Sequence, residues 1–194
     1  MSIRAGAAGT AELILDAAQR RAQTRGFNGF SYADIAAELN VTTASIHYHF
    51  SSKAELGATL INRYTAGFLG ALAAIDVSGG SARDRLQDYA RIYEDVLASN
   101  RLCLCGMLAA EYETLPEAMQ DKLVEFFKKN EDWVATLLRG GREQGELGFS
   151  GDPRKSASAL VSALEGAMLV ARAYGGVASF RSSTKLLLAG LCGG

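Results

Sequence analysis

Residues 31–53 read SYADIAAELNVTTASIHYHFSSK, and this stretch decides the fold of the N-terminal part of the chain. Ser31 and Asp34 have the spacing of a helix-capping box. The apolar residues that follow share one helical face: Ile35, Ala36 and Leu39. Asn40 tolerates the left-handed conformation that ends a helix in a tight turn. A second short segment follows at once, so the stretch predicts two helices joined by a turn.

The second helix of this pair is expected at about residues 43–49, with Ile46 and Phe50 as its apolar anchors. Its other side chains are small, hydroxyl-bearing or aromatic, and none is acidic: Thr42, Thr43, Ala44, Ser45, His47, Tyr48 and His49. Such a surface fits the major groove of DNA. Lys53 opens the next helix, where an ammonium beside free amide groups would hold a phosphate. Structural hairpins share this geometry, so the pattern alone leaves DNA binding open.

The composition of the chain excludes several protein classes. Twenty basic and 21 acidic residues give 194 residues a net charge of −1, so total charge does not indicate nucleic-acid binding. Three cysteines form no disulfide framework, which favours a reducing compartment. The longest apolar run, residues 64–75, is about a dozen residues, whereas a membrane span needs roughly 20. We expect a soluble cytoplasmic protein without a signal peptide and without a membrane partner.

Helical periodicity dominates the whole chain, and only two prolines interrupt it. Ser52 and Glu55 predict a second capping box, and no segment alternates with the period of a strand. The sequence predicts an all-α fold of about nine helices. We expect a three-helix helix-turn-helix DNA-binding domain over residues 1–52 and a larger helical ligand-binding and dimerisation domain over residues 53–194.

Residues of about 10–60 resemble the DNA-binding domain of the TetR family of transcriptional regulators. The resemblance rests on these matching segments: Gly26-Phe27, Asp34-Ile35-Ala36, Val41, and residues 46–50 and 52–56. The last block is similar to the family signature YxHFxxKxxL, with His47 in its first place. Asn40 departs from the glycine that is frequent in the family's turn, and Ala44 is too small to read a base. Neither residue is expected to disturb the fold, and the base sequence that the protein reads stays open.

The resemblance implies a set of DNA contacts. Thr43, Ser45 and His47 would face base edges. The remaining contacts would go mainly to the DNA backbone: Thr42, Tyr48, His49 and Lys53. For Tyr48 two placements stay open: the side chain stands outward and contacts the DNA backbone, or its ring packs under the helix and only its hydroxyl reaches a phosphate. The family's architecture further implies a homodimer on a palindromic operator and a small-molecule pocket in the C-terminal region.

Small residues recur at four-residue spacing in the penultimate helix, and such a stripe lets two helices approach closely. The stripe serves either a contact between subunits or a contact within one subunit, and we favour the first. The predicted dimer interface comprises Ala159, Ala163, Ala167, Val170, Leu187 and Leu191.

Candidate effector-binding residues are aromatic, sulfur-bearing or acidic side chains in otherwise apolar helices: Tyr89, Tyr93, Cys103, Met107, Glu111, Phe127, Trp133 and Glu165. Aromatic and methionine side chains at helical spacing also fit an ordinary core. Glu165 either orients a ligand, pairs with Arg172, or pairs with another helix. Cys103 and Cys105 point about 200° apart on a helix, so we expect two buried thiols rather than a bridge, with a thiol sensor as the alternative.

Together these features predict a ligand-responsive DNA-binding transcriptional regulator. We expect a repressor that releases its operator when it binds a small hydrophobic or amphipathic molecule. The alternative is a helical ligand-binding or adaptor module without DNA activity. An enzyme is not expected, because the chain has no nucleotide-binding, hydrolase or metalloprotease motif and both histidines lie in residues 43–49. We expect no cofactor and no metal, since His47 and His49 lie on different helix faces.

Overall fold

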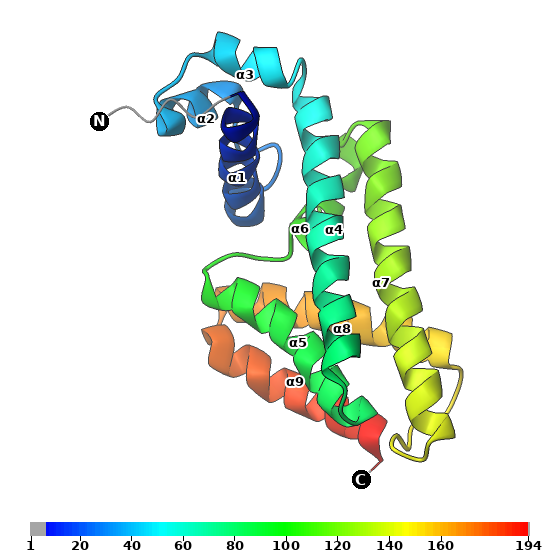
Figure 1. Ribbon diagram of the computed structural model, residues 1–194. Helices are drawn as coiled ribbons and strands as arrows, with labels where there is room; N and C mark the ends of the chain where they lie inside the picture. Colours follow the sequence, from blue (N-terminus) through cyan, green and yellow to red (C-terminus); the bar gives the residue numbers. More distant parts are fainter. Residues whose placement is uncertain (1–6, 194) are drawn as a thin grey trace. The chain divides into compact units, whose positions relative to one another are not determined.

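The computed structural model describes residues 7–193, and every regular element in that range is helical (Figure 1). The elements are α1 (Ala7–Arg25), α2 (Tyr32–Leu39), α3 (Thr43–His49), α4 (Lys53–Ser78), α5 (Ala82–Ala98), α6 (Leu104–Ala109), the 3-10 helix η1 (Tyr112–Thr114), α7 (Glu117–Glu143), α8 (Pro153–Ala173) and α9 (Gly176–Cys192). The prediction of an all-α fold with about nine helices is confirmed over the described residues.

The chain forms two compact units. The first comprises the chain up to Tyr64 together with Leu104–Leu123, and the second comprises Thr65–Cys103 together with the chain from Val124 onward. The long helices α4 and α7 each begin in the first unit and end in the second. The domain boundary predicted between residues 52 and 53 stays a prediction: α4 begins at Lys53, but its first three turns and Leu104–Leu123 belong to the first compact unit.

The start of α2 and the turn that follows it have the geometry that the sequence predicts. Asp34 Oδ2 accepts a hydrogen bond from the Ser31 backbone N–H at 2.7 Å, and Ser31 Oγ accepts one from the Asp34 N–H at 3.3 Å. Asn40 has a φ of 53°, in the left-handed region, and its N–H bonds back to α2. The Val41 N–H donates to Ala36 O at 3.0 Å, which fixes the turn against α2.

The start of α4 differs from the predicted capping box by one residue. The Glu55 N–H donates to Ser52 Oγ at 3.1 Å, as expected. The Glu55 carboxylate, however, accepts from the backbone N–H of Ser51 at 2.9 Å and from its hydroxyl at 2.6 Å. Because Ser51 offers both its backbone N–H and its hydroxyl, the Glu55 carboxylate bonds to Ser51 instead of to the backbone N–H of Ser52.

Ion pairs join α1 to its neighbours within the first unit. Arg20 and Arg21 both contact Glu38 of α2, at 2.6 and 2.9 Å. Arg63 of α4 contacts Glu12 and Asp16 of α1, at 3.0 and 2.8 Å. Beneath these pairs, α1 contributes its buried apolar face to the core: Ile14, Leu15, Ala17, Ala18 and Ala22. Apolar burial holds the unit together, and the exposed pairs add little to its stability.

In the second unit, α8 and α9 lie side by side and α5 packs against both (Figure 1). Among the described helices, α8 is long and apolar enough to cross a membrane, and 33% of its most apolar 18-residue segment is buried. Length and composition are weak evidence on their own, because a core helix of similar length passes the same test.

Candidate DNA-binding helix and effector-binding cluster

Helix α3 is anchored on one side and open on the other. Ile46 is fully buried and Phe50 is 5% exposed, so these two side chains fasten the helix to the first unit. Thr42 caps the helix, and its Oγ1 accepts from the Ser45 N–H at 3.1 Å. The remaining predicted contact residues on and beside α3 are exposed or half-buried: Thr42, Thr43, Ser45, His47, Tyr48 and His49. All six side chains are therefore at least partly accessible to a binding partner.

Tyr32 of α2 positions α3, a role that the sequence analysis did not identify. Its hydroxyl donates to Phe50 O at 3.0 Å, and its ring meets the edge of the His47 ring with centroids 4.8 Å apart. Burial, with a smaller contribution from Glu55, raises the pKa of Tyr32 to about 12, so the hydroxyl stays a donor at neutral pH. The capping-box spacing identified Ser31, whereas no sequence pattern indicated a role for Tyr32.

The imidazole of His47 has one nitrogen engaged. Its Nδ1 lies 3.3 Å from Ser51 O. Because a carbonyl oxygen only accepts, Nδ1 carries the proton in the neutral ring and Nε2 is left as an acceptor. An acceptor at this position suits the amino groups that adenine and cytosine present in the major groove.

Tyr48 stands outward, which resolves the two placements that the sequence left open. Its side chain is 81% exposed, and its ring contacts the edge of the His49 ring at a centroid distance of 5.2 Å. The ring is therefore not packed under α3, and the whole side chain is accessible to a binding partner.

Lys53 is engaged within the first unit rather than turned outward. Its Nζ donates to Phe27 O at 2.6 Å and also to Phe30 O, and it lies 4.6 and 4.4 Å from the two ring centroids. Burial lowers the pKa of Lys53, opposed by the charges of Glu111 and Asp34. This ammonium holds the loop between α1 and α2, and its predicted contact with DNA phosphate stays a prediction.

Glu111 holds the same loop from the other side. Its carboxylate accepts from the backbone N–H groups of Phe27 at 2.5 Å and Asn28 at 3.1 Å. Gly26 has a φ of 82°, and a Cβ there would lie 2.7 Å from Glu111 Oε1, so a larger residue would strain the backbone and displace the carboxylate. Glu111 and Met107, predicted as effector contacts, both belong to the first unit, whereas the other candidates belong to the second.

The second unit contains a closed ring of buried hydrogen bonds. Tyr89 Oη donates to Asn130 Oδ1 at 2.8 Å, Asn130 Nδ2 donates to Tyr93 Oη at 2.9 Å, and the two hydroxyls are 3.0 Å apart. Desolvation raises the pKa of both tyrosines, so both stay protonated. Asn130 was missed in the sequence, although an amide on the apolar face of α7 was a usable signal.

Aromatic rings surround this hydrogen-bonded ring. Phe68 lies with its centroid 5.1 Å from that of Phe126, 6.1 Å from Tyr93 and 6.5 Å from Tyr89. Trp133 stacks at a tilt on Tyr89 at 5.5 Å. Phe127 extends the group through Phe126, at 5.2 Å. Four predicted effector residues, Tyr89, Tyr93, Phe127 and Trp133, therefore belong to one aromatic cluster.

Glu165 supplies an unsatisfied acceptor in the same unit. It accepts a hydrogen bond from the Cys103 thiol, while its Oε1 is buried without a hydrogen-bond partner. Desolvation raises the pKa of Glu165 to about 7. Arg172, one of the partners considered from the sequence, donates to Asn100 O instead. Cys103 and Cys105 are both buried, as expected for small core residues.

The six residues predicted at a dimer interface lie on one face of α8 and α9. Ala159, Leu187 and Leu191 line a shallow hollow of about 200 Å³. Ala163, Ala167 and Val170 line the next, of about 520 Å³, together with Leu187. Within this face Val170 is 61% and Leu186 74% exposed. Monomeric proteins seldom leave a continuous apolar surface of this kind open to water.

Two family models match the chain, one over the helix-turn-helix and one over the C-terminal helices. Residues 14–58 match the model described as bacterial regulatory proteins, tetR family. Residues 82–187 match the tetracyclin repressor-like C-terminal domain. The chain belongs to the TetR family. This assignment confirms the family resemblance noted from residues 10–60 and extends it through the helical C-terminal region.

Relatives of this TetR-family protein span most of its length. A solved TetR-family regulator from Agrobacterium tumefaciens superimposes with a TM-score of 0.93 at 31% identity, covering 97% of this chain and 100% of that one. The transcriptional repressor NemR of Escherichia coli strain K12 is 28% identical over 84% of each chain. The regulator AcuR of Cereibacter sphaeroides is 29% identical over 76% of this chain and 69% of its own.

Family membership confirms the predicted function at the level of the class. This TetR-family protein is a ligand-responsive DNA-binding transcriptional regulator, and it is not an enzyme. The alternative of an adaptor without DNA activity has no support among these relatives. Members of the family typically act as dimers with small-molecule effectors.

Proposed function

We propose that this TetR-family regulator is a homodimeric repressor that inserts α3 of each protomer into the major groove of a palindromic operator. The observation that supports this most directly is the free surface of α3, which is polar, small and without an acidic side chain. Thr43, Ser45 and His47 would read base edges, and Thr42, Tyr48 and His49 would contact the backbone. Such a protein works on chromosomal DNA, in the cytoplasm.

The apolar face of α8 and α9 supports the proposed dimer. A twofold dimer uses the same surface patch on both protomers, and the stripe of small residues allows close approach of the helices. Each of the predicted interface residues belongs to this open face. Association would cover Val170 and Leu186 and would fix the spacing of the two α3 helices, which must match half-sites about one helical turn apart.

The aromatic cluster of the second unit is the proposed effector site. Its rings offer apolar contact, and Glu165 Oε1 offers a buried acceptor without a donor. A hydrophobic or amphipathic molecule that carries a hydrogen-bond donor would satisfy this atom. Release of the operator follows if the effector binds better to a conformation with another spacing of the α3 helices, because the ligand then shifts the population towards it.

A footprint on the promoter upstream of the protein's own gene tests the proposal. We expect protection at low salt that weakens steeply as salt is added, because backbone contacts release counterions. Thr43→Ala combined with His47→Ala should lower the operator affinity measured by the footprint at least tenfold, since good hydrogen-bonded base contacts are worth about 1–3 kcal/mol each. Lys128→Ala is the matched control, because Lys128 is an exposed cation on α7, outside α3. Equal losses in both variants, or no protection at low salt, contradict the proposal.

A further inference from the structure

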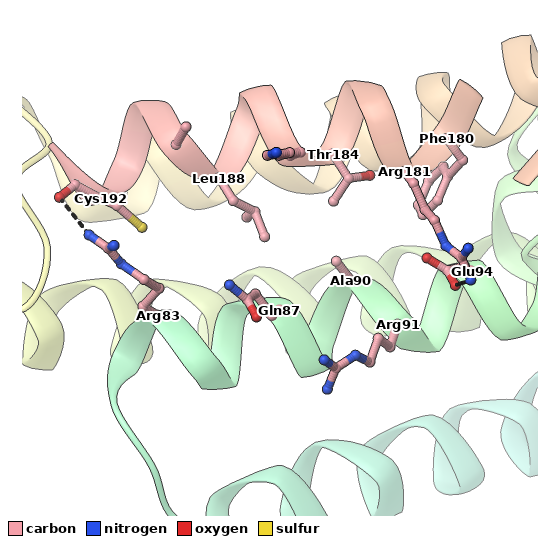
Figure 2. Close-up of a pocket in the computed structure, with 12 residues that line it drawn as sticks. Arg83, Gln87, Ala90, Arg91, Glu94, Phe180, Arg181, Thr184, Leu188 and Cys192 are labelled. Atoms are coloured by element: carbon pink, nitrogen blue, oxygen red, sulfur yellow. Dashed lines mark hydrogen bonds and ion pairs between the residues drawn. The ribbon is translucent and has the colours of Figure 1, made fainter. Parts of the chain in front are cut away.

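A groove runs between α5 and α9 in the second unit, at residues that the effector cluster does not use (Figure 2). Its volume of about 390 Å³ lies within the range of small-molecule sites. The floor is apolar, because Phe180 and Leu188 are buried there and Ala90 faces them across the groove. The groove can therefore receive the apolar body of a small molecule.

One polar atom of the floor has no partner. Thr184 is 7% exposed, and its Oγ1 is buried without a hydrogen bond. Figure 2 shows the side chain between α9 and α5, with its methyl group toward α5 and its hydroxyl oxygen toward Arg181. Leaving a buried hydroxyl unsatisfied costs about 1–3 kcal/mol, so a bound group that accepts its hydrogen bond would recover part of that cost.

The charges around the groove are mainly positive. Four cations line it, against one carboxylate: Arg83, Arg91, Arg181 and Lys185 against Glu94. Arg181 pairs with Glu94 at 2.6 Å and Arg91 pairs with Asp88, so two of the four cations have a carboxylate partner. At the other end of the groove from Glu94, Arg83 contacts the Cys192 carbonyl oxygen at a long 3.4 Å (Figure 2). Lys185, the residue after Thr184, is exposed. Arg83 and Lys185 therefore supply the positive charge that no carboxylate of the described residues neutralises, and Thr184 lies nearer the Arg181–Glu94 pair than Arg83 (Figure 2).

We propose that this groove is a second small-molecule site, which binds an amphipathic carboxylate. The Thr184 hydroxyl donates to the carboxylate, Lys185 and Arg83 supply the opposite charge, and the apolar body packs on Ala90, Phe180 and Leu188. A carboxylate fits better than a phosphate, because the groove offers one buried donor and monovalent side chains instead of a nest of amide groups. The site is distinct from the proposed effector cluster in both residues and charge.

Calorimetric titration of the full-length protein with decanoate tests the proposal, with decanol and decyltrimethylammonium as uncharged and cationic probes of equal chain length. We expect a dissociation constant for decanoate below about 1 mM and weaker binding of both other probes. Arg83→Gln combined with Lys185→Gln, and separately Thr184→Val, should weaken decanoate binding about tenfold. Ala189→Trp should abolish it, because Ala189 is exposed and lines the groove.

Lys155→Gln is the matched control, since Lys155 is an exposed cation of α8 outside the groove, and its affinity for decanoate should equal that of the wild type. Thr184→Val should also raise the free energy of unfolding without ligand, because it removes the unsatisfied hydroxyl.

Decanoate should slow the reaction of the half-exposed Cys192 thiol with a disulfide reagent in the wild type, because Cys192 lines the groove.

Three results would overturn the groove site: equal binding of the three probes, decanoate binding that survives Ala189→Trp, or binding lost in Tyr93→Phe but kept in the groove variants. The last result would place decanoate in the aromatic cluster. The operator footprint of the same samples tests the proposed function separately, so the failure of one proposal is distinguishable from the failure of the other.

Discussion

The side chain of Glu165 links the chemistry of one residue to the stability of the second unit. Its pKa is about 7 in the folded protein against an ordinary value of 4.5, because burial disfavours the charged form. Between those values the unfolded chain ionises this group while the folded chain keeps it protonated. Its contribution therefore destabilises the fold progressively as pH rises from about 4.5 to about 7, and levels off above that.

Glu165→Gln should remove this contribution. The difference in unfolding free energy between the variant and the wild type should grow by about 1–3 kcal/mol, in favour of the variant, when the pH is raised from 5 to 8. Urea denaturation at the two pH values measures the gain. Glu143→Gln, at the exposed end of α7, is the matched control and should follow the wild type. Parallel pH dependence in Glu165→Gln and the wild type would show that Glu165 is ionised in the fold.

Lys53 gives a second prediction at the scale of one residue. Its ammonium bonds to two carbonyl groups of the loop between α1 and α2, so Lys53→Gln should lower the stability of the first unit. If the ammonium keeps these two bonds in the DNA complex, the dependence of operator affinity on salt should keep its slope, because no phosphate contact is then lost. Gel shifts over a range of salt concentrations measure that slope. A slope reduced by about one unit would instead show that Lys53 neutralises a phosphate.

At the scale of elements, the turn between α2 and α3 shows how local chemistry fixes the reading helix. Asn40 adopts a φ of 53°, which costs an alanine about 1 kcal/mol and a glycine nothing. We expect Asn40→Ala to lower the thermal midpoint by several degrees and Asn40→Gly to leave it close to the wild type. Equal effects of the two substitutions on thermal unfolding, followed by circular dichroism, would show that the conformation of Asn40 is not what matters.

The helices and their ends were predictable because their signals are local. Ser31, Asp34, Asn40 and the apolar periodicity act within one or two turns, and the structure confirms each of them. The sites were less predictable because their partners are distant in sequence. Nothing near Lys53 indicates that its ammonium meets the carbonyl groups of Phe27 and Phe30, 26 and 23 residues away.

The same distinction explains the effector cluster. Tyr89 and Tyr93 were visible as a helical pair, but Asn130 completes their hydrogen-bonded ring from 41 and 37 residues away. Glu111, a carboxylate in an apolar segment, gave the same sequence signal as Glu165. The signal marks a carboxylate that needs partners, and only the fold shows that Glu111 finds backbone amides while one oxygen of Glu165 finds none.

At the scale of the whole molecule, DNA binding depends on whether two copies associate. Val170 lies in the open apolar face of α8 and α9 and is 61% exposed, so an aspartate there is tolerated by the monomer. In the proposed dimer, two such carboxylates would be buried without partners near the twofold axis. We therefore expect Val170→Asp to produce a folded monomer by sedimentation velocity.

Loss of the dimer should weaken operator binding far more than loss of one base contact. Two linked reading helices bind with avidity, whereas separate protomers must each bind alone, so affinity should fall by about a hundredfold or more. Val124→Asp is the matched control, because Val124 is a 54% exposed valine on α7, outside the apolar face. It should remain dimeric and keep its footprint. A Val170→Asp protein that stays dimeric would exclude this face as the interface, and a monomer with undiminished protection would show that one α3 helix is sufficient for operator binding.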